Sequence, residues 1–581
     1  QLNFMYWRYF MLNFSGRQND IQGHGNIMHG NWITGINFLD ELRVGPQDNM
    51  PHDIINNKAH NTFYMLPLIL GIIGILVQVL RKGDRGIQGF WITFFLFFMT
   101  GIAIVLYLNQ PPFQPRERDY AYAGSFYAFC IWIGVGVAGI AQLLERAKIP
   151  SVAASTLATL ICVLVPVQMA SQTWDDHDRS GRYVARDFGR NYLESCEPNA
   201  IIFTHGDNDT VPLWYVQEVE GVRTDVRVCN TSYLQTDWYI NQMKRQAYNS
   251  EPLPISWTYN DYLQGKRDLI YIIPSSEQPR PINLSTALNF IKSDDPKHKY
   301  SYGSTMQDYI PTSRFILNID SATVVQNKTV NKEYEPYIEQ EINMNFDGKN
   351  YITKVDAISM DMINTNNWER PIYYASTVPG SLYNYVGNNL QKTGLALQLV
   401  PMNTTQHDIT INTTKMYDNV MNKFKWGGVD KPGIYLEENT MRMCKSYRQV
   451  LFTDLAEALI KEGKADSALK VLDRCVEVLP EENVPYDFSV YPLARLYFTL
   501  GEVEKAKEIT AKMVERSMTE VDWMLRLKPA QREAFIRNIN YNLAIMRDIL
   551  TVSMQHDKEF AQSYIERFNN YSMQFESGKK K

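Results

Sequence analysis

Cysteine is scarce in this chain, with six residues among 581, and the few histidines follow no protease pattern. There is no Cys-x-x-Cys pair, which argues against a zinc ribbon or a dithiol redox motif. There is no His-Glu-x-x-His sequence either, which argues against a zinc protease site. An oxidising compartment would permit a disulfide between Cys196 and Cys229, but the sequence does not establish one.

An excess of positive charge is also lacking. The net charge of −5 argues against nucleic acid as the main partner, which would require a basic face. The first residue is Gln, and no signal peptide with a basic start and an apolar middle precedes the first polar loop. We therefore expect the chain to be the C-terminal portion of a longer protein.

Long apolar segments are abundant in the first third of the chain. Each has close to the roughly 20 residues that a membrane-spanning helix needs. They cover Asn61–Leu80, Gly89–Leu108, Ser125–Leu144 and Val152–Ala170. Pro67 and Pro166 are tolerated in membrane helices. The sequence therefore predicts an α-helical membrane domain with at least four spans.

The short loops after the first and third segments are basic, which predicts that they face the cytoplasm. Their basic residues are Arg81, Lys82, Arg85, Arg146 and Lys148. Residues 1–60, the loop 109–124 and everything beyond Ser171 should then lie together on the outer face. This orientation predicts a multi-pass membrane protein whose soluble C-terminal part lies on the outer face.

The loop 109–124, NQPPFQPRERDYAYAG, is short, polar and held between two apolar segments. Prolines open it, and its polar centre consists of Arg116, Glu117, Arg118, Asp119 and Tyr120. Arginine binds phosphate through planar, bidentate and permanently charged contacts, so these residues are predicted to bind a lipid-linked phosphate. In the alternative interpretation, the charges pair with each other and the tyrosines only anchor helix ends.

Residues 1–60 combine an aromatic run with a stretch rich in Gly, Asn and His. Arg17, Asp20 and His24 are candidate catalytic residues, because they could supply a phosphate contact and a proton acceptor at the membrane edge. Alternatively, the polar side chains of this stretch satisfy its own backbone.

Beyond Ser171, AIIFTHGD, NDTVPLWYVQEVEG and DVRVCNTSYL predict a strand, a helix and a strand, which form a βαβ unit with a parallel sheet. His205, Asp207 and Asp209 follow the first strand, where such sheets bind ligands. These residues are predicted to bind substrate or a divalent cation, although capping of the helix is the alternative role. Further strands are expected in KRDLIYIIP, SRFILNI and RPIYYAS, with a helix in ISMDMINTNNW.

The C-terminal part contains a helical repeat. The segments beginning at Leu455 and Leu493 align so that Gly463 matches Gly501 and Ala468 matches Ala506, a pattern typical of tetratricopeptide-like hairpins. The predicted organisation is therefore a polar outer loop, a membrane domain, a soluble α/β domain and a tetratricopeptide-like helical domain. Their predicted ranges are 1–60, 61–170, 171–445 and 446–575.

Three motifs resemble a large family of bacterial multi-pass membrane proteins with a domain of unknown function. They are YWRYFMLNFSGRQNDIQGHG, NQPPFQPRERDYAYAGSFYAF and IIFTHGDNDTVPLWYVQEVEGVRTDVRVCNTSYL. That family is similar to the vertebrate transmembrane protein O-mannosyltransferase, and its members look like GT-C glycosyltransferases. The resemblance implies a polyprenyl-phosphate-linked sugar as donor and a soluble outer domain, often with tetratricopeptide repeats. GT-C enzymes usually place the catalytic acid in an early outer loop, which we expect to precede this chain.

The resemblance implies a protein O-glycosyltransferase that acts on an exported protein. The main alternative is a membrane-anchored scaffold without catalysis, whose α/β and helical domains bind envelope proteins. A transporter for lipid-linked sugars would usually show charged residues within its membrane helices, and the four apolar segments have none.

Overall fold

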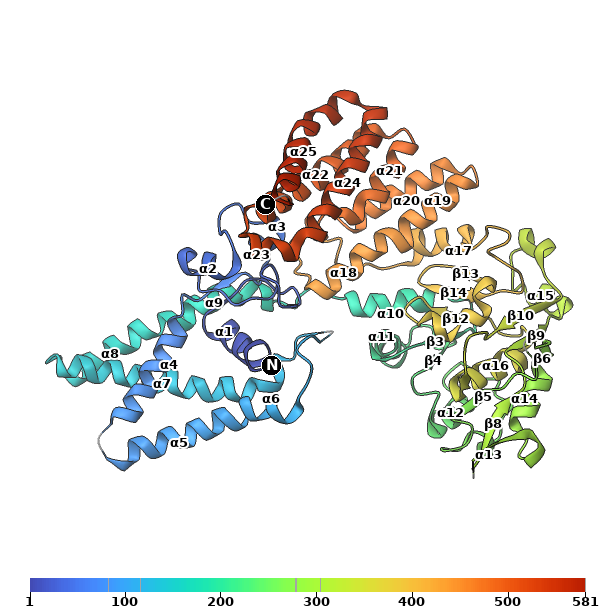
Figure 1. Ribbon diagram of the computed structural model, residues 1–581, viewed down its shortest axis with the longest axis horizontal. Coiled ribbons are helices and arrows are strands. Elements are labelled where there is room, and N and C mark those ends of the chain that lie inside the picture. The colour runs from blue at the N-terminus through green and yellow to red at the C-terminus, as the bar shows by residue number, and fades with distance from the viewer. Residues whose placement is uncertain (82, 115, 277–278, 304, 580–581) are drawn as a thin grey trace. The chain divides into compact units, whose positions relative to one another are not determined.

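The computed structural model in Figure 1 describes residues 1–581 except 82, 115, 277–278, 304 and 580–581. The chain divides into two units, and each is described by itself. Unit 1 comprises Gln1–Ser180, Pro432–Ser446 and Glu481–Lys581. Unit 2 comprises Gly181–Lys431 and Tyr447–Pro480.

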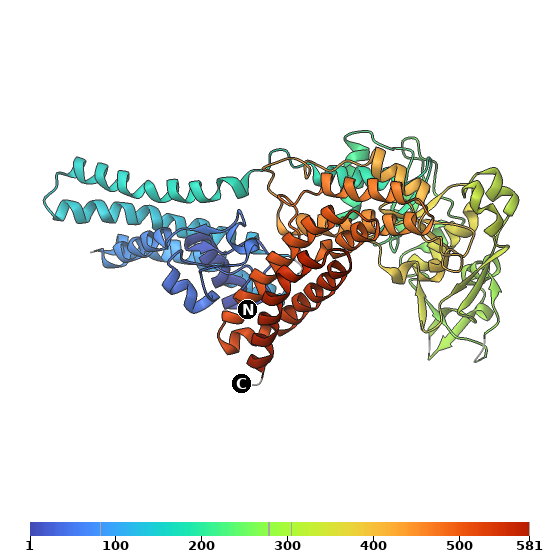
Figure 2. The same ribbon diagram turned by 90° about the horizontal axis from the view of Figure 1, so that it is seen from above.

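The apolar segments form the helices of unit 1, and the blue and cyan ribbons of residues 66–177 run side by side in Figures 1 and 2. These helices are α4 (Leu66–Leu80), α5 (Asp84–Met99), α6 (Ile102–Leu108), α7 (Ala123–Arg146), α8 (Ser151–Cys162) and α9 (Leu164–His177). Among the described residues, three helical stretches are long and apolar enough to cross a membrane: Asp84–Leu108, Asp119–Arg146 and Ser151–His177.

The first predicted span differs from expectation, because helix α4 has 15 residues and begins at Leu66 instead of Asn61. Residues Asn61–Thr62 form strand β2, which pairs with β1 (Gly16–Arg17). Met65 then takes a left-handed conformation with φ 57°, and Pro67 stands in the first turn of the helix. At about 1.5 Å per residue, α4 is shorter than the roughly 30 Å of a bilayer core. The structure therefore supports three candidate spans, and the fourth is not confirmed.

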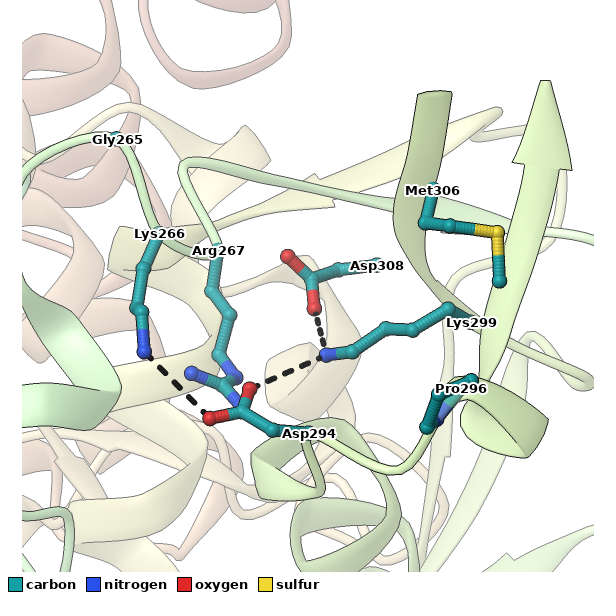
Figure 3. Close-up of a pocket in the computed structure, with 8 residues that line it drawn as sticks. All are labelled: Gly265, Lys266, Arg267, Asp294, Pro296, Lys299, Met306 and Asp308. Carbon is teal, nitrogen blue, oxygen red and sulfur yellow. Dashed lines mark hydrogen bonds and ion pairs between the residues drawn. The ribbon is translucent and has the colours of Figure 1, made fainter. Parts of the chain in front are cut away.

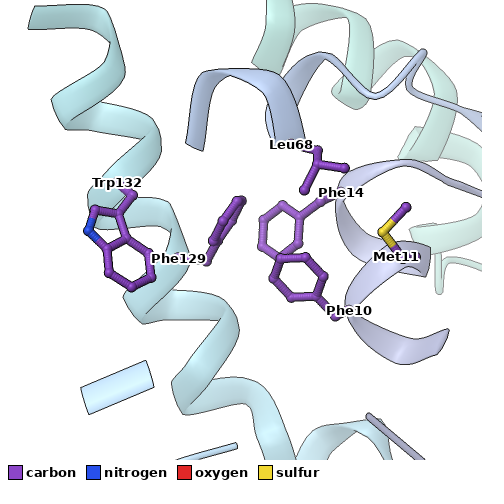
Figure 4. Close-up of a cluster of buried hydrophobic side chains, with 6 residues drawn as sticks. All are labelled: Phe10, Met11, Phe14, Leu68, Phe129 and Trp132. Atoms are coloured by element: carbon purple, nitrogen blue, oxygen red, sulfur yellow. The ribbon is translucent and has the colours of Figure 1, made fainter. Parts of the chain in front are cut away.

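Aromatic side chains hold the aromatic run at the start of the chain against these helices. The run forms a π-helix, Leu2–Trp7, followed by α1 (Arg8–Phe14). Figure 4 shows the buried cluster that joins α1 to α4 and α7, which consists of Phe10, Met11, Phe14, Leu68, Phe129 and Trp132. The run is thus a buried element of unit 1.

Glycines set the spacing between α4 and α7. A Cβ added at Gly74 would lie 1.8 Å from the Trp132 carbonyl oxygen, and one added at Gly136 would lie 2.2 Å from the Leu70 carbonyl oxygen. Small residues at such crossings let two helix backbones approach closely, which is a common way of packing helices in membranes.

The remaining elements of unit 1 lie in the polar loop and in the C-terminal part. They are α2 (Asn37–Val44), α3 (His52–Ile55), the 3-10 turn Asp119–Tyr122, α18 (Glu438–Tyr447), α21 (Tyr491–Thr499), α22 (Val503–Arg526), α23 (Pro529–Arg532), α24 (Ile536–His556) and α25 (Lys558–Lys579). The polar loop packs on α22: Trp523 donates to the Pro46 carbonyl at 2.9 Å, and Arg526 pairs with Asp48 at 3.0 Å. Arg516 of the same helix pairs with Asp53.

Unit 2 is built on a mixed sheet with the strand order β13-β14-β12-β3-β4. Its strands are β3 (Ile201–Thr204), β4 (Arg227–Asn230), β12 (Ile372–Ala375), β13 (Leu390–Lys392) and β14 (Ala396–Leu399). Strand β3 runs parallel to both β4 and β12, and helix α11 (Asp207–Glu218) connects β3 to β4. The predicted βαβ unit is therefore confirmed.

Two smaller sheets and several helices complete unit 2. The sheets have the orders β11-β5-β8-β7 and β10-β9-β6. Their strands are β5 (Leu269–Ile272), β6 (Ile282–Asn283), β7 (Lys299–Tyr302), β8 (Thr305–Ile310), β9 (Arg314–Asn318), β10 (Glu341–Asn345) and β11 (Tyr351–Thr353). The helices are α10 (Val184–Glu194), α12 (Asp237–Met243), α13 (Tyr259–Tyr262), α14 (Leu284–Lys292), α15 (Ser321–Gln326), α16 (Lys354–Asn366), α17 (Thr413–Asp418), α19 (Asp454–Lys461) and α20 (Ala465–Val478). The strands predicted at KRDLIYIIP, SRFILNI and RPIYYAS are present as β5, β9 and β12, and α16 is the expected helix before the last of them.

The predicted repeat region is helical, and Gly463 and Gly501 take positive φ angles of 75° and 80° at its two turns. The first helix pair, α19 and α20, belongs to unit 2, whereas α21 and α22 belong to unit 1. The tetratricopeptide-like assignment and the four predicted domain ranges stay predictions.

Replacing Gly136 with alanine should destabilise the helices of unit 1, because the added Cβ would overlap the Leu70 carbonyl. Forced overlaps of this kind cost roughly 1–3 kcal/mol. Gly134→Ala is a matched control on the same helix, since a Cβ at Gly134 meets nothing within 4 Å. Thermal unfolding in detergent measures both variants, and equal melting temperatures would contradict the proposed close packing.

Candidate functional site

An ion pair between Arg8 and Glu117 fixes the loop 109–124 against helix α1. The guanidinium donates two hydrogen bonds to the carboxylate, at 3.0 Å to Oε1 and 2.6 Å to Oε2. Arg8 also donates to the Gly30 carbonyl at 2.8 Å, and the Gly23 amide donates to Glu117 at 3.1 Å. A Cβ at Gly23 would lie 2.7 Å from Nη1 of Arg8, so a larger residue here would displace the guanidinium from its present position.

The two charges of this pair stabilise each other away from water. Burial opposes ionisation of Glu117, but the hydrogen bonds and charge of Arg8 outweigh it and lower the pKa of the carboxyl below its usual value. Glu117 therefore carries a full negative charge that Arg8 neutralises. These contacts position the loop, and the predicted role of Glu117 in substrate binding stays a prediction.

Arg116 and Arg118 remain available for a ligand. Among the residues that the structure describes, neither guanidinium has an ion-pair or hydrogen-bond partner. Arg116 is exposed, and Arg118 is half-buried with its Nε atom buried and unsatisfied. The Arg118 backbone amide donates to the Tyr9 hydroxyl at 3.2 Å, which fixes the backbone while leaving the side chain free. The alternative in which the loop's charges pair with each other is wrong for these two arginines.

Asp119 and Tyr120, the last two residues of the predicted phosphate-binding set, lie in the 3-10 turn Asp119–Tyr122 that leads into α7. Asp119 is half-buried, and its carboxylate accepts from the Tyr120 amide at 3.1 Å. The Tyr120 side chain is 59% exposed. These contacts are typical of the start of a helix. Among the described residues, Asp119 forms no ion pair with Arg116 or Arg118.

An apolar groove of about 380 Å³ opens between the helices of unit 1. Its walls include Phe14 of α1, Pro67 and Leu70 of α4, Cys130 of α7, Cys162 of α8 and Met169 of α9. Cys130 lies seven residues after Ala123, the first residue of α7, which is about 10 Å along the helix. The groove therefore begins near the end of α7 at which the loop arginines lie.

The three predicted catalytic residues do not bond to one another. Asp20 is half-buried and accepts hydrogen bonds from Asn57 at 2.8 Å, from the Tyr435 hydroxyl and from the Glu438 amide at 3.3 Å. Arg17 donates to the Asn19 carbonyl at 3.0 Å. Its charge also lowers the pKa of Tyr435, which burial and Asp20 raise well above the usual value. Arg17 and Asp20 thus act on the same tyrosine.

His24 lies elsewhere, beside the loop 109–124. Its exposed ring is 6.4 Å from the ring of Phe113, and it influences a second histidine, His29. Burial lowers the pKa of His29 to about 4, with Asp53 opposing the shift and His24 adding to it. His29 is therefore a neutral imidazole at physiological pH.

Sequence reasoning missed Arg8, Tyr9 and His29. A single cation within an aromatic run was the available signal for Arg8, because a buried charge requires a partner. His29 gave no signal, since its environment depends on packing against distant residues.

In unit 2, the structure brings His205 and Asp209 together. The Asp209 carboxylate accepts from the His205 amide at 3.1 Å and from the Thr377 hydroxyl at 2.7 Å. The His205 ring lies 2.9 Å from the Thr231 hydroxyl. Asp207 is exposed and 3.5 Å from the Tyr233 hydroxyl. These contacts join the carboxyl ends of β3, β4 and β12, so the predicted location at the sheet edge has a defined geometry.

A separate cavity of about 300 Å³ lies beside β7 and β8. As Figure 3 shows, its lining includes three basic side chains, those of Lys266, Arg267 and Lys299. Arg267 pairs with Asp294 at 2.7 Å, and Lys299 pairs with Asp308 at 2.5 Å. Lys266 reaches Asp294 at 3.5 Å. Because these acids already neutralise most of the positive charge, the arrangement suits a structural network better than an anion site.

The proposed disulfide partners Cys196 and Cys229 are free thiols, with exposed fractions of 5% and 0%. Burial raises the pKa of the Cys229 thiol to about 12. Both residues are therefore buried, unreactive thiols in this structure.

Replacing Glu117 with glutamine should destabilise unit 1 by roughly 2–4 kcal/mol, because the buried Arg8 guanidinium loses its counter-charge. Asp119→Asn is the control, since this carboxylate lies in the same loop and bonds to the adjacent Tyr120 amide. Unfolding in detergent is the measurement. A Glu117→Gln protein as stable as the control would show that the pair does not hold the loop.

Comparison with known proteins bears on unit 2. Residues 185–420 match a protein-family model described as TMEM260-associated domain 2. No curated protein and no solved structure matches the chain. The matched residues include every strand of the mixed sheet and the carboxyl ends of β3, β4 and β12. The match is consistent with a TMEM260-like family.

Proposed function

We propose that this chain is the C-terminal part of a membrane-bound protein O-glycosyltransferase that resembles O-mannosyltransferases and draws its sugar from a polyprenyl-phosphate carrier. The observation that carries the proposal is the pair Arg116 and Arg118 shortly before α7, whose guanidiniums have no ion-pair or hydrogen-bond partner among the described residues. A phosphate monoanion or diester is the ligand that two such groups suit best.

The apolar groove supports a lipid-linked ligand over a free phosphate. Its lining is almost entirely apolar, and it starts about 10 Å along α7 from the loop. A prenyl chain in the groove would place its phosphate at the membrane surface, where the arginines lie. Both parts of the carrier would then have a binding surface within unit 1.

In the proposed reaction, the bond between sugar C1 and the carrier's phosphate oxygen breaks, and C1 bonds to a Ser or Thr hydroxyl oxygen of the acceptor. The electron pair of the broken bond remains on the phosphate, where Arg116 and Arg118 stabilise the developing charge. Arg17 is proposed as an additional phosphate contact.

Asp20 is the carboxylate proposed to receive the acceptor's proton. Three donors already bond to the Asp20 oxygens, which leaves about one lone-pair site of the carboxylate for the acceptor's hydroxyl. His24 is exposed beside the loop and offers an alternative proton acceptor. In the described parts of the chain, no group of three or more His, Cys, Asp or Glu side chains could hold a metal ion.

The acceptor is proposed to be an exported protein, met on the periplasmic face of the inner membrane. His205, Asp207 and Asp209 of unit 2 would face this acceptor or its sugar. The helix pairs are proposed as tetratricopeptide-like elements that present the polypeptide.

The double variant Arg116→Ala, Arg118→Ala should bind polyprenyl phosphate at least tenfold more weakly, because two charged contacts to phosphate are lost. Binding is measured by titration of the full chain in nanodiscs. The control is Arg146→Ala with Lys148→Ala, which removes the same charge at the other end of α7.

Glycoproteomic comparison of cells that carry each variant in the full-length gene tests the transfer itself. Loss of glycans with the first variant alone supports the proposal. Unchanged lipid binding and unchanged glycans with that variant would overturn it and favour a scaffold.

A further inference from the structure

His205 lies at the carboxyl end of the mixed sheet in unit 2, and its tautomer follows from the hydrogen bonds of its neighbours. The Thr231 hydroxyl donates its only hydrogen to the Thr204 carbonyl at 2.8 Å. It must therefore accept from Nδ1 of His205, which lies 2.9 Å away. In its neutral form, His205 then has an unprotonated Nε2. No described residue bonds to Nε2, and the side chain is exposed.

A buried carboxylate lies directly behind this histidine. Asp209 is 2% exposed, and its Oδ2 accepts from the His205 amide and from Thr377. Its Oδ1 atom is buried and has no hydrogen-bond partner within the described part of unit 2. A buried carboxylate oxygen of this kind requires a donor, which a ligand can supply directly or through a water molecule.

Further polar groups face solvent at the same edge. Asp207 and Asn208 are exposed at the start of α11, and Ser232 is exposed at the end of β4. Ser232 lies 3.3 Å from the His205 ring and accepts from the Gly206 amide at 3.0 Å. The edge thus combines carboxylate and imidazole acceptors with amide and hydroxyl groups that can also donate.

Aromatic side chains border these polar groups. Trp214 and Tyr233 are nearly parallel, with an angle of 7° and centroids 6.4 Å apart, and Tyr233 lies 6.0 Å from Trp238. Trp238 is 55% exposed, and the Tyr233 hydroxyl lies 3.5 Å from Asp207. The aromatic group is therefore joined to the polar edge through a shared contact.

We propose that this edge is a carbohydrate-binding site, in which the aromatic group packs on the apolar face of a sugar ring. The partly positive C–H groups of that face suit the negative face of an aromatic ring. Sugar hydroxyls donate to His205 Nε2 and to Asp207, and they accept from Asn208. Asp209 supplies the remaining acceptor behind the histidine.

Other ligand classes fit less well. Asp207 and Asp209 repel a phosphate or a carboxylate. A lysine or arginine side chain would suit the two acids and the aromatic rings, but it has no acceptor for the Asn208 amide or the Ser232 hydroxyl. Sugar hydroxyl groups both donate and accept, so a neutral carbohydrate matches the whole set.

This inference rests on the role that the proposed function gives to His205, Asp207 and Asp209, but sugar binding can be tested apart from the transfer reaction, because the site lies in unit 2 and uses none of the loop arginines. Saturation-transfer NMR on the full chain tests it, with mannose, glucose, galactose and N-acetylglucosamine as probes. The protein is kept in a detergent without a sugar headgroup, so that the detergent cannot occupy the site.

Wild type should bind at least one of these sugars, and Trp238→Ala and Asp207→Ala should each weaken binding at least tenfold. Tyr259→Ala is the control, since this residue is a 50% exposed aromatic on α13 that belongs to no part of the site. Thermal unfolding confirms that the variants fold. The variant Arg116→Ala, Arg118→Ala should keep full sugar binding, which separates this test from that of the proposed function.

Absence of binding to all four sugars would overturn the proposal, as would unchanged affinity in both site variants. A lysine- and arginine-rich peptide is titrated in parallel. If the peptide binds and depends on Asp207 and Trp238 whereas no sugar does, the edge recognises basic polypeptide instead and the carbohydrate assignment is wrong.

Discussion

The arrangement of the membrane-proximal site depends on the bidentate ion pair between Arg8 and Glu117. Because Arg8 occupies both carboxylate oxygens of Glu117, this acid cannot neutralise its neighbours Arg116 and Arg118. A lysine at position 8 would act as a point charge and could not occupy both oxygens in a fixed plane. The pair thus positions the loop and leaves Arg116 and Arg118 without partners in the part of the chain that the structure describes.

The apolar helices and the βαβ unit could be predicted because each follows from a local pattern. Three stretches satisfy the length and hydropathy of a span, and the strand IIFT is bounded by polar residues and followed by a helix. The start of the first segment could not be predicted in this way. Asn61 and Thr62 are extended because they pair with Gly16 and Arg17, and no local pattern reports that pairing.

The candidate sites, too, combine features that follow from local sequence with features that depend on distant residues. The position of His205 and Asp209 at a strand end follows from sequence, whereas the tautomer of His205 depends on Thr231 across the sheet. The loop arginines stood out by composition, but their lack of partners among the described residues depends on Arg8, which is 109 residues away from Glu117. Asp20 has the right residue type for a base, and only the structure shows that Tyr435 and Asn57 already bond to it.

The short helix α4 would affect the surrounding lipid if it lies in a bilayer beside the three candidate spans. Its 15 residues cover about 23 Å, several ångströms less than an average bilayer core, and it forms one wall of the apolar groove. Such hydrophobic mismatch is relieved when lipids next to the helix compress, at a cost of a fraction of a kcal/mol per ångström. Under the proposed function, the groove would then open where the bilayer is locally thinned, and acyl-chain length would influence how readily a polyprenyl carrier enters it.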